Sequence, residues 1–348
     1  MNLFKTRPVR TSLVGATLLC AGLMAAQAAS AKVTLRANSQ WPETHAGSQV
    51  DKWWADEIRK RTDGEVDIQM FFAGALGKAK ENLELLRTNA IDIAMMSPGY
   101  FPAQLPMHAA PNSIPMTMEK VEHATELIER LLDEVPAMEE EAKANGVKTL
   151  FFHHLNPYQL VCKEPVTDVA GMAGKKMRTW GKALPQAVEA VGATPVTLFL
   201  PEIYEGLARG TVDCIPFSVD LMISYKIYEV AKHMSDITVW LGPTNGTWIS
   251  LAAWDQLSAD QQKIVEEVSR EAMRKDRDAT LASGSKSREK LKELGVQFHP
   301  FPDSEKQKWK DANPDFFADF IKDMEAKGKG DDARKMIDIW LEVTSSSS

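Results

Sequence analysis

The sequence has few cysteines and, beyond its first 31 residues, no long hydrophobic run. Only Cys162 and Cys214 lie beyond that leading segment, and their spacing along the chain does not establish whether their sulfur atoms meet. We favour two buried thiols, with a disulfide in an oxidising compartment as the alternative. No later apolar run approaches the roughly 20 residues that a helix needs to cross a bilayer, so we predict no membrane-spanning helix there.

The sequence also lacks the short motifs of common catalytic and metal sites. It has no G-x-S-x-G, H-E-x-x-H or C-x-x-C, and the glycine-rich runs at 74–80 and 171–176 lack the spacing of a phosphate-binding loop. His153 and His154 are adjacent, and neighbouring residues of a strand point to opposite faces, so they are poorly placed to share one metal ion. We predict a non-enzyme without metal or cofactor. Catalytic groups assemble in space rather than along the chain, so a hydrolase is kept as an alternative.

Residues 1–31 have the pattern of a secretory signal peptide. Three basic residues precede an apolar run over 13–26, and Ala-x-Ala sites end at Ala31, where we expect cleavage. We therefore predict a free periplasmic protein. Removal of the three cations makes the formal net charge more negative than −7, and an acidic surface argues against nucleic acid as a partner.

The segment from Gly174 to Ser218 alternates between strand and helix patterns. Strand, helix, strand, helix and strand are expected in turn at 175–179, 184–191, 194–200, 201–210 and 211–215. This alternation predicts an α/β layer with mainly parallel strands. Ligands of such sheets sit at the carboxyl ends of the strands, where Arg178 would face a cleft. Its planar guanidinium suits a carboxylate; the alternative role is a structural ion pair.

The residues after the signal peptide predict a strand over 33–37 and a helix over 46–62. The loop between them carries Trp41, which either forms a wall of a binding site or packs beneath the loop. Ser97, which ends another apolar strand, and Tyr100 just after it are placed in the same way. Loops at strand ends commonly bind ligands, so we include all three residues among the candidates.

A long helix is predicted from residue 258 towards Leu294. Ser258 and Gln261 have the spacing of a capping box, and apolar periodicity continues until Gly295. At about 1.5 Å per residue, an unbroken helix of this length is roughly 50 Å long and exceeds the diameter of one lobe, so it would brace two. Gly284 is the position at which it would break.

Three motifs, in this order, resemble the solute receptors of tripartite ATP-independent periplasmic (TRAP) transporters, the DctP-type family. They are G-x-K-x-R ending at Arg178, G-A-T-P-V at 192–196, and E-x-Y-E-G-L-x-x-G-T-V-D at 202–213. Residues 62–97 are also similar to the strand, G-x-L-G turn, helix and strand of that family. The resemblance extends over essentially the whole chain after the signal peptide.

The resemblance implies an α/β, two-lobed periplasmic binding protein of type II-like architecture, with the ligand cleft between the lobes and a long interlobe helix. We expect residues 148–162 to cross between the lobes. The expected division is lobe I at 32–156 with 244–290 returning to it, lobe II at 157–243 with 291–344 packing back on it, and a frayed tail at 345–348.

In function, the resemblance implies a monomeric receptor that captures a small organic acid anion and delivers it to TRAP membrane subunits. Binding would shift an equilibrium between open and closed lobes. An ABC-type binding protein and a periplasmic hydrolase are the alternatives, and a continuous interlobe helix would favour the TRAP type.

Two departures from the family bear on the solute. Some members that take multiply polar acids have a second arginine where this sequence has Tyr158, and the asparagine usual after V-D-G is replaced by Phe217. A second carboxylate would be poorly compensated on burial, so we predict a monocarboxylate with an apolar or aromatic body. The predicted site residues are Arg178, Phe217, Tyr158, Trp180, Trp41, Ser97 and Tyr100.

Overall fold

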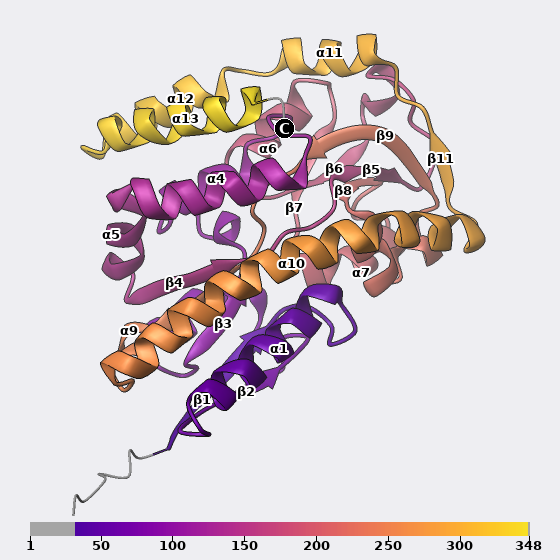
Figure 1. The fold of residues 1–348 in the computed structure, drawn as a ribbon. Helices are drawn as coiled ribbons and strands as arrows, with labels where there is room; N and C mark the ends of the chain where they lie inside the picture. The colour runs from indigo at the N-terminus through magenta and orange to yellow at the C-terminus, as the bar shows by residue number, and fades with distance from the viewer. Residues whose placement is uncertain (1–31, 347–348) are drawn as a thin grey trace, which may run out of the picture. The chain divides into compact units, whose positions relative to one another are not determined.

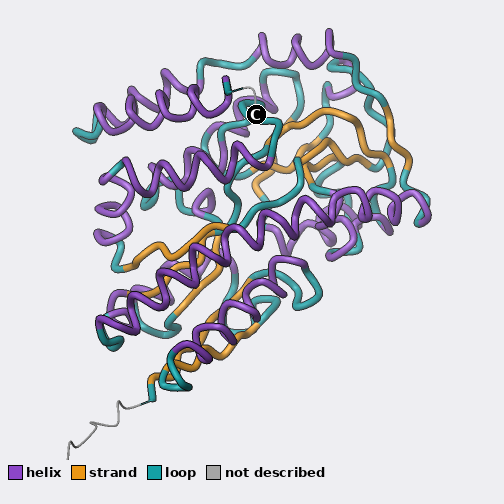
Figure 2. The backbone as a smooth tube through the Cα atoms, viewed as in Figure 1, coloured by secondary structure: helices purple, strands orange, loops and turns teal. Residues whose placement is uncertain are grey.

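The protein folds around two β-sheets, one in each lobe (Figures 1 and 2). The computed structural model describes residues 32–346. The predicted signal peptide, residues 1–31, lies outside the described residues, as do the last two residues of the predicted frayed tail. Ser345, the first residue of that tail, is still part of the last helix.

The sheet of lobe I has five strands in the order β2-β1-β3-β10-β4. β1 pairs in parallel with β2 and β3, whereas β10 runs antiparallel to β3 and β4. Its strands are β1 (Val33–Ser39), β2 (Val66–Phe71), β3 (Ile93–Met96), β4 (Val147–Phe152) and β10 (Gly246–Ser250).

The sheet of lobe II has six strands in the order β11-β9-β5-β8-β6-β7. The predicted parallel unit is present, since β6 pairs in parallel with both β7 and β8, while β5 runs antiparallel to β8 and β9. Its strands are β5 (Tyr158–Cys162), β6 (Lys176–Thr179), β7 (Thr194–Thr197), β8 (Cys214–Phe217), β9 (His233–Trp240) and β11 (Gln297–His299).

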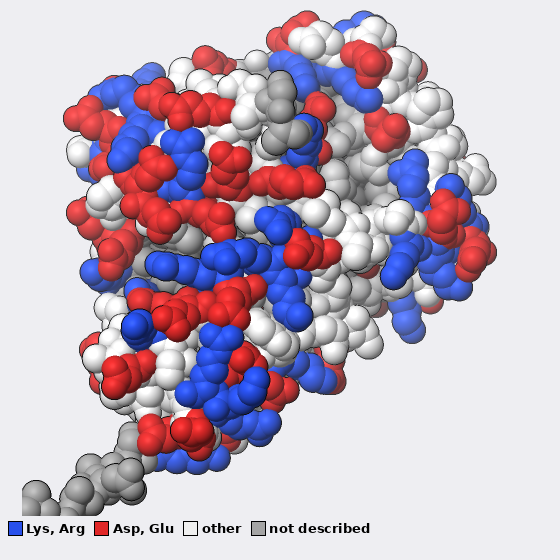
Figure 3. Space-filling view, in the orientation of Figure 1, with Lys and Arg blue, Asp and Glu red and all other residues white. Residues whose placement is uncertain are grey.

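Helices cover both sheets. They are α1 (Ala46–Arg61), α2 (Asn82–Arg87), α3 (Pro106–Ser113), α4 (Val121–Glu134), α5 (Pro136–Ala144), α6 (Ala183–Glu189), α7 (Ile203–Ala208), α8 (Val219–Ser224), α9 (Leu251–Trp254), α10 (Ala259–Glu293), α11 (Asp303–Ala312), α12 (Phe316–Glu325) and α13 (Gly330–Ser345). Over residues 32–346 no helix is both long and apolar enough to cross a bilayer. Lys and Arg side chains are mixed with Asp and Glu over the face that carries α1, α4 and α10 (Figure 3).

The long helix α10 joins the two lobes. The predicted capping box is present, because the Ser258 hydroxyl accepts the Gln261 N–H and the Gln261 side chain accepts the Ser258 N–H. α10 contacts α1 and β4 of lobe I and α8 of lobe II. It continues through Gly284, where a Cβ would lie 2.4 Å from Oδ1 of Asn156. The glycine therefore does not break the helix but lets the chain between β4 and β5 approach it.

The expectation for the C-terminal segment is wrong in part. Residues 297–312 do pack on lobe II, since β11 joins its sheet and Trp309 its core. The chain then returns, and α12 and α13 bury Phe320, Met336 and Trp340 in the core of lobe I. Their place beside α4 is visible in Figure 1. The apolar faces of these helices match either lobe, so helical periodicity does not show which lobe they cover.

The expectation of two buried thiols is also wrong. Cys162 on β5 and Cys214 on β8 form a disulfide. The two strands are antiparallel neighbours, and these residues face each other in the register. The bond therefore lies wholly within lobe II.

Candidate functional site

A small cavity lies where the two sheets approach each other. Six of the seven predicted site residues line it: Trp41, Ser97, Tyr100, Tyr158, Arg178 and Trp180. They come from both lobes, since the first three follow β1 and β3 and the others lie on or after β5 and β6. The cavity volume is about 20 Å³, which is room for a water molecule rather than an organic acid. The lobes are therefore closed on each other, and a solute has to enter before they close.

Phe217 does not line this cavity. Its ring is fully buried and lies 5.9 Å from the ring of Tyr158 and 6.3 Å from that of Tyr225. It supports Tyr158 from behind, since both side chains belong to the core of lobe II.

Arg178 is a buried cation on β6 without a carboxylate partner. Only 2% of it is exposed. Nε donates to the carbonyl oxygen of Leu198 at 3.2 Å, and the guanidinium lies 4.3 Å from the ring centre of Trp180. Nη1 has no hydrogen-bond partner, and no carboxylate of the described residues forms an ion pair with Arg178. The structural ion pair that was the alternative role of this residue is thus absent from the described part of the chain, and a buried unpaired cation favours an anionic ligand.

Two tyrosines and two tryptophans form the wall around Arg178. The ring of Tyr158 lies 5.6 Å from Trp180 and 5.1 Å from Trp240. The Tyr100 hydroxyl accepts the backbone N–H of Leu200 at 3.0 Å. Burial raises the pKa of Tyr100 and of Tyr158, so both keep their hydroxyl protons at physiological pH. These hydroxyls are neutral groups that can donate to an anion.

Ser97 is held by Asn112. Its hydroxyl donates to Oδ1 of Asn112 at 2.7 Å, and the Asn112 amide donates to the carbonyl oxygens of Pro243 and Thr244. Trp180 Nε1 donates to the carbonyl oxygen of Asn112 at 2.9 Å. Ser97 therefore lines the cavity with its proton already engaged, and Asn112 joins the loops of lobe I to a wall residue of lobe II.

Trp41 lines the cavity, and it also packs with the core of lobe II although it follows a strand of lobe I. Its contact with a solute stays a prediction. Its ring lies 4.4 Å from that of His45 and 4.9 Å from that of His153. Its Nε1 is buried without a hydrogen-bond partner among the described residues.

Several cavity residues were not predicted from the sequence. Two of them, Gln40 and Asn245, form a hydrogen bond in which Gln40 Nε2 donates to Asn245 Oδ1 at 3.0 Å. A polar residue directly before Trp41 in the same loop, and an Asn-Gly pair at the start of β10, are signals that could have identified them. The others are Asn112, Leu155, Leu200, Trp240 and Thr244.

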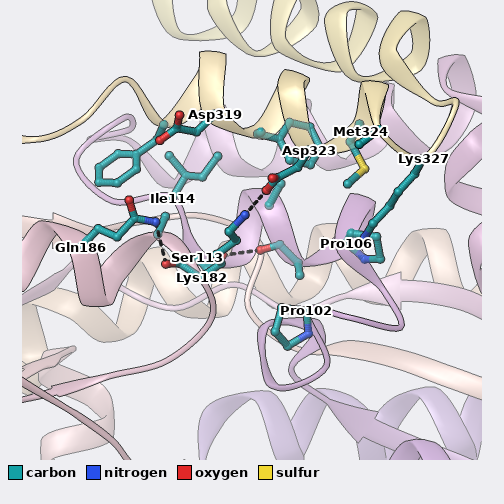
Figure 4. A pocket seen from close by; sticks show the side chains of 16 residues that line it. Pro102, Pro106, Ser113, Ile114, Lys182, Gln186, Asp319, Asp323, Met324 and Lys327 are labelled. Carbon is teal, nitrogen blue, oxygen red and sulfur yellow. Dashed lines mark hydrogen bonds and ion pairs between the residues drawn. The ribbon is translucent and has the colours of Figure 1, made fainter.

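A larger pocket of about 330 Å³ lies between α3, α6 and α12 (Figure 4). Lys182 reaches across it to Asp323 and is already paired. None of the described residues that line it has a buried polar atom without a partner. The smaller cavity has both an unpaired cation and unpaired donors, and we therefore take it as the candidate site.

The chain is similar to known bacterial receptors over most of its length. The sequence model of the bacterial extracellular solute-binding protein family 7 (DctP) matches residues 37–323. The 2,3-diketo-L-gulonate-binding periplasmic protein YiaO of Escherichia coli is 26% identical over 327 residues, which are 92% of this chain and 96% of that one.

Solved structures show the same fold at low sequence identity. A Bordetella pertussis extracytoplasmic solute receptor, DctP7, which binds pyroglutamic acid, superimposes with a TM-score of 0.80 at 17% identity, covering 89% of this chain and 99% of that one. A TRAP periplasmic solute-binding protein from Sulfitobacter with bound β-D-galacturonate has a TM-score of 0.77 at 19% identity, covering 90% and 100%.

Proposed function

The chain belongs to the bacterial extracellular solute-binding protein family 7, and we propose that it captures a monocarboxylate at Arg178 and delivers it to TRAP membrane subunits. The family consists of solute-binding proteins rather than enzymes. The finer part of the proposal is that the solute is an organic acid with one carboxylate, bound among aromatic side chains in the periplasm.

The observation that carries the proposal is the unpaired cation of Arg178. A buried guanidinium without a counter-ion is costly, and a carboxylate that accepts from Nη1 would remove that cost. Charge-assisted bonds of this kind are stronger than bonds between neutral groups. With one arginine in the described cavity lining, a second carboxylate would be buried without a partner, which supports a monocarboxylate over a dicarboxylate.

The similar proteins support an organic acid as the solute. Three of them are named for monocarboxylates, 2,3-diketo-L-gulonate, pyroglutamic acid and galacturonate, whereas a relative from Rhodobacter capsulatus is named for C4-dicarboxylates. The preference for one carboxylate therefore rests on the lining of the cavity and not on these names. The continuous α10 contacts both lobes, which supports a TRAP-type receptor over an ABC-type one. A hydrolase would need a nucleophile and a base in the cavity, and its described lining has none of the usual combinations.

Delivery would follow from closure. A solute held between Arg178 of lobe II and Trp41 of lobe I makes its full set of contacts only when the lobes are closed. It therefore shifts the equilibrium towards the closed form, which would be the form that the membrane subunits recognise.

The test is a thermal-shift screen of the purified protein against mono- and dicarboxylates, including pyroglutamate, galacturonate, mandelate, benzoate and succinate. A solute at 100 times its dissociation constant adds about 2.7 kcal/mol to the free energy of unfolding. Arg178→Met should abolish the shift, and the exposed control Arg209→Met should keep it. A shift that survives in Arg178→Met would overturn the anchor. If succinate gave the largest shift, the preference for a monocarboxylate would be wrong.

A further inference from the structure

Gln40 and Asn245 form a buried amide pair in the wall of the cavity. Gln40 Nε2 donates to Asn245 Oδ1 at 3.0 Å, and the two residues are 2% and 3% exposed. Their backbones are held as well, because the Gln40 carbonyl oxygen accepts from the Tyr225 hydroxyl and that of Asn245 accepts from the N–H of His153. The pair is therefore a fixed part of the site.

Each amide of the pair has one group without a partner. Gln40 Oε1 and Asn245 Nδ2 are both buried and unpaired. If both side-chain amides were flipped, so that their oxygen and nitrogen atoms changed places, Asn245 would become the donor and Gln40 the acceptor of the bond between them. One donor and one acceptor would still be left without a partner. The chemistry that the pair presents is thus independent of how the two amides are oriented.

The other unpaired side-chain atoms of the cavity lining are donors only. Among the described lining residues they are Trp41 Nε1, Arg178 Nη1 and Trp240 Nε1. A carboxylate can accept from these groups, but it has no proton to give to the acceptor of the amide pair. A buried acceptor that is left unsatisfied costs free energy. A solute that is only a carboxylate on an apolar body would leave that acceptor unpaired.

We propose that the solute is a monocarboxylate whose body carries a hydroxyl or a secondary amide, and that Gln40 and Asn245 recognise this group. Either group both donates and accepts, which matches the pair. An ammonium group would also supply a proton, but it would place a second cation near Arg178. The inference rests on the proposed function and narrows it, since a purely apolar or aromatic body no longer fits. The donor requirement equally disfavours a fully ionised dicarboxylate.

The test compares acids of matched shape by isothermal titration calorimetry with the purified protein. Pyroglutamate is paired with cyclopentanecarboxylate, which has the same ring size without the amide. Mandelate is paired with phenylacetate, which lacks only the hydroxyl. We expect at least one polar member to bind roughly 10- to 100-fold more tightly than its apolar counterpart, the factor that an unmade buried hydrogen bond gives.

Variants assign this preference to the amide pair. Gln40→Met and Asn245→Leu should each bring the ratio of the two affinities close to one. The exposed control Gln307→Met should keep the wild-type ratio. The wild-type comparison alone still tests the solute class if a variant does not fold.

The outcomes separate this inference from the proposed function. If both members of each pair bind the wild type equally, the receptor function stands and the inference is wrong. A preference that Gln40→Met and Asn245→Leu both retain would also overturn the role of the pair. If the wild type binds no acid of the calorimetric pairs or of the thermal-shift panel, the proposed function itself is wrong, and the inference with it.

Discussion

His45 and Asp220 join the two lobes through one buried hydrogen bond. Nε2 of His45, in the loop before α1, lies 3.3 Å from Oδ2 of Asp220 in the first turn of α8. Nδ1 of the same ring accepts the backbone N–H of Gly47 at 3.1 Å. Because Nδ1 is an acceptor, Nε2 carries the ring proton and donates it to Asp220. The bond connects residues of opposite lobes, and we expect it to form only when they are closed.

Asp220→Leu should therefore weaken solute binding. It leaves the His45 N–H without an acceptor in the closed form, so the closed fraction falls and the apparent affinity falls with it. We expect an effect of about tenfold, measured by calorimetry with the acid that gives the largest thermal shift. Asp220→Asn retains an oxygen that can accept the same bond and should recover most of the affinity. Equal affinity of Asp220→Leu and wild type would exclude a role of this contact in closure.

The second prediction concerns pH. The imidazole of His153 lies 2.9 Å from a carboxylate oxygen on each side, Asp51 at Nε2 and Asp276 at Nδ1. Burial lowers the pKa of His153, but the two carboxylates raise it more, to about 10. Burial raises the pKa of Asp51. The pKa of Asp276 is lowered, since His153 and His154 outweigh its burial, and Asp276 is therefore the ionised partner.

A histidine with a raised pKa in the folded state stabilises the protein fully below its unfolded pKa of about 6.5. That contribution is lost as pH rises towards 10. The contribution of this residue to the free energy of unfolding should therefore decrease steadily as pH rises between these values. Urea unfolding between pH 6.5 and 9.5 measures the slope. Asp276→Asn should reduce the slope of the free energy of unfolding against pH, relative to wild type and to the exposed control Asp278→Asn. An unchanged slope in Asp276→Asn would show that the ion pair of His153 and Asp276 does not cause the pH dependence.

The third prediction concerns the contact between α10 and the crossing after β4. A Cβ at residue 284 would lie 2.4 Å from Oδ1 of Asn156, whose amide donates to the carbonyl oxygen of Thr280. Gly284→Ala should destabilise the protein by about 1–3 kcal/mol through overpacking, although alanine is the better helix former. In an Asn156→Ala background the same change should cost little or stabilise. A double-mutant cycle by urea unfolding measures this coupling, and additive effects would contradict it.

The fourth prediction concerns the disulfide. Cys162 and Cys214 are 52 residues apart in sequence, so breaking their bond frees a long loop in the unfolded chain. Reduction should lower the free energy of unfolding by about 2–4 kcal/mol, visible as a lower melting temperature by calorimetry. The variant Cys162→Ala/Cys214→Ala should melt at the lower temperature with or without reductant. If reductant left the wild-type melting temperature unchanged, the bond would not contribute to stability.

Local patterns identified much of this fold. The capping box at Ser258, the strand that holds Arg178 and the crossing at 148–162 all have signals within a few residues. Those signals are hydrogen bonds and apolar periodicities between residues that are close in sequence, and the same local interactions are present in the folded protein.

Contacts between distant residues could not be predicted in the same way. Gln40 and Asn245 are 205 residues apart in sequence, and neither carries a local pattern that pairs it with the other. The disulfide partners and the return of α12 to lobe I are of the same kind. Gly284 is a case in which the local signal predicted a helix break that does not occur. Its role in α10 depends on the close approach of Asn156, which is distant in sequence, rather than on helix propensity.

The way the chain passes between the sheets bears on how the protein withstands cleavage. Within residues 32–346 it crosses at 153–157, at 241–245, along α10 and at 313–315. A protease that cuts one of these segments leaves the two lobes covalently linked, because the other three crossings remain intact. The two fragments of a nicked molecule should be held together by packing and should separate only after denaturation. Damage at a single crossing would then not release a captured solute by letting one half dissociate.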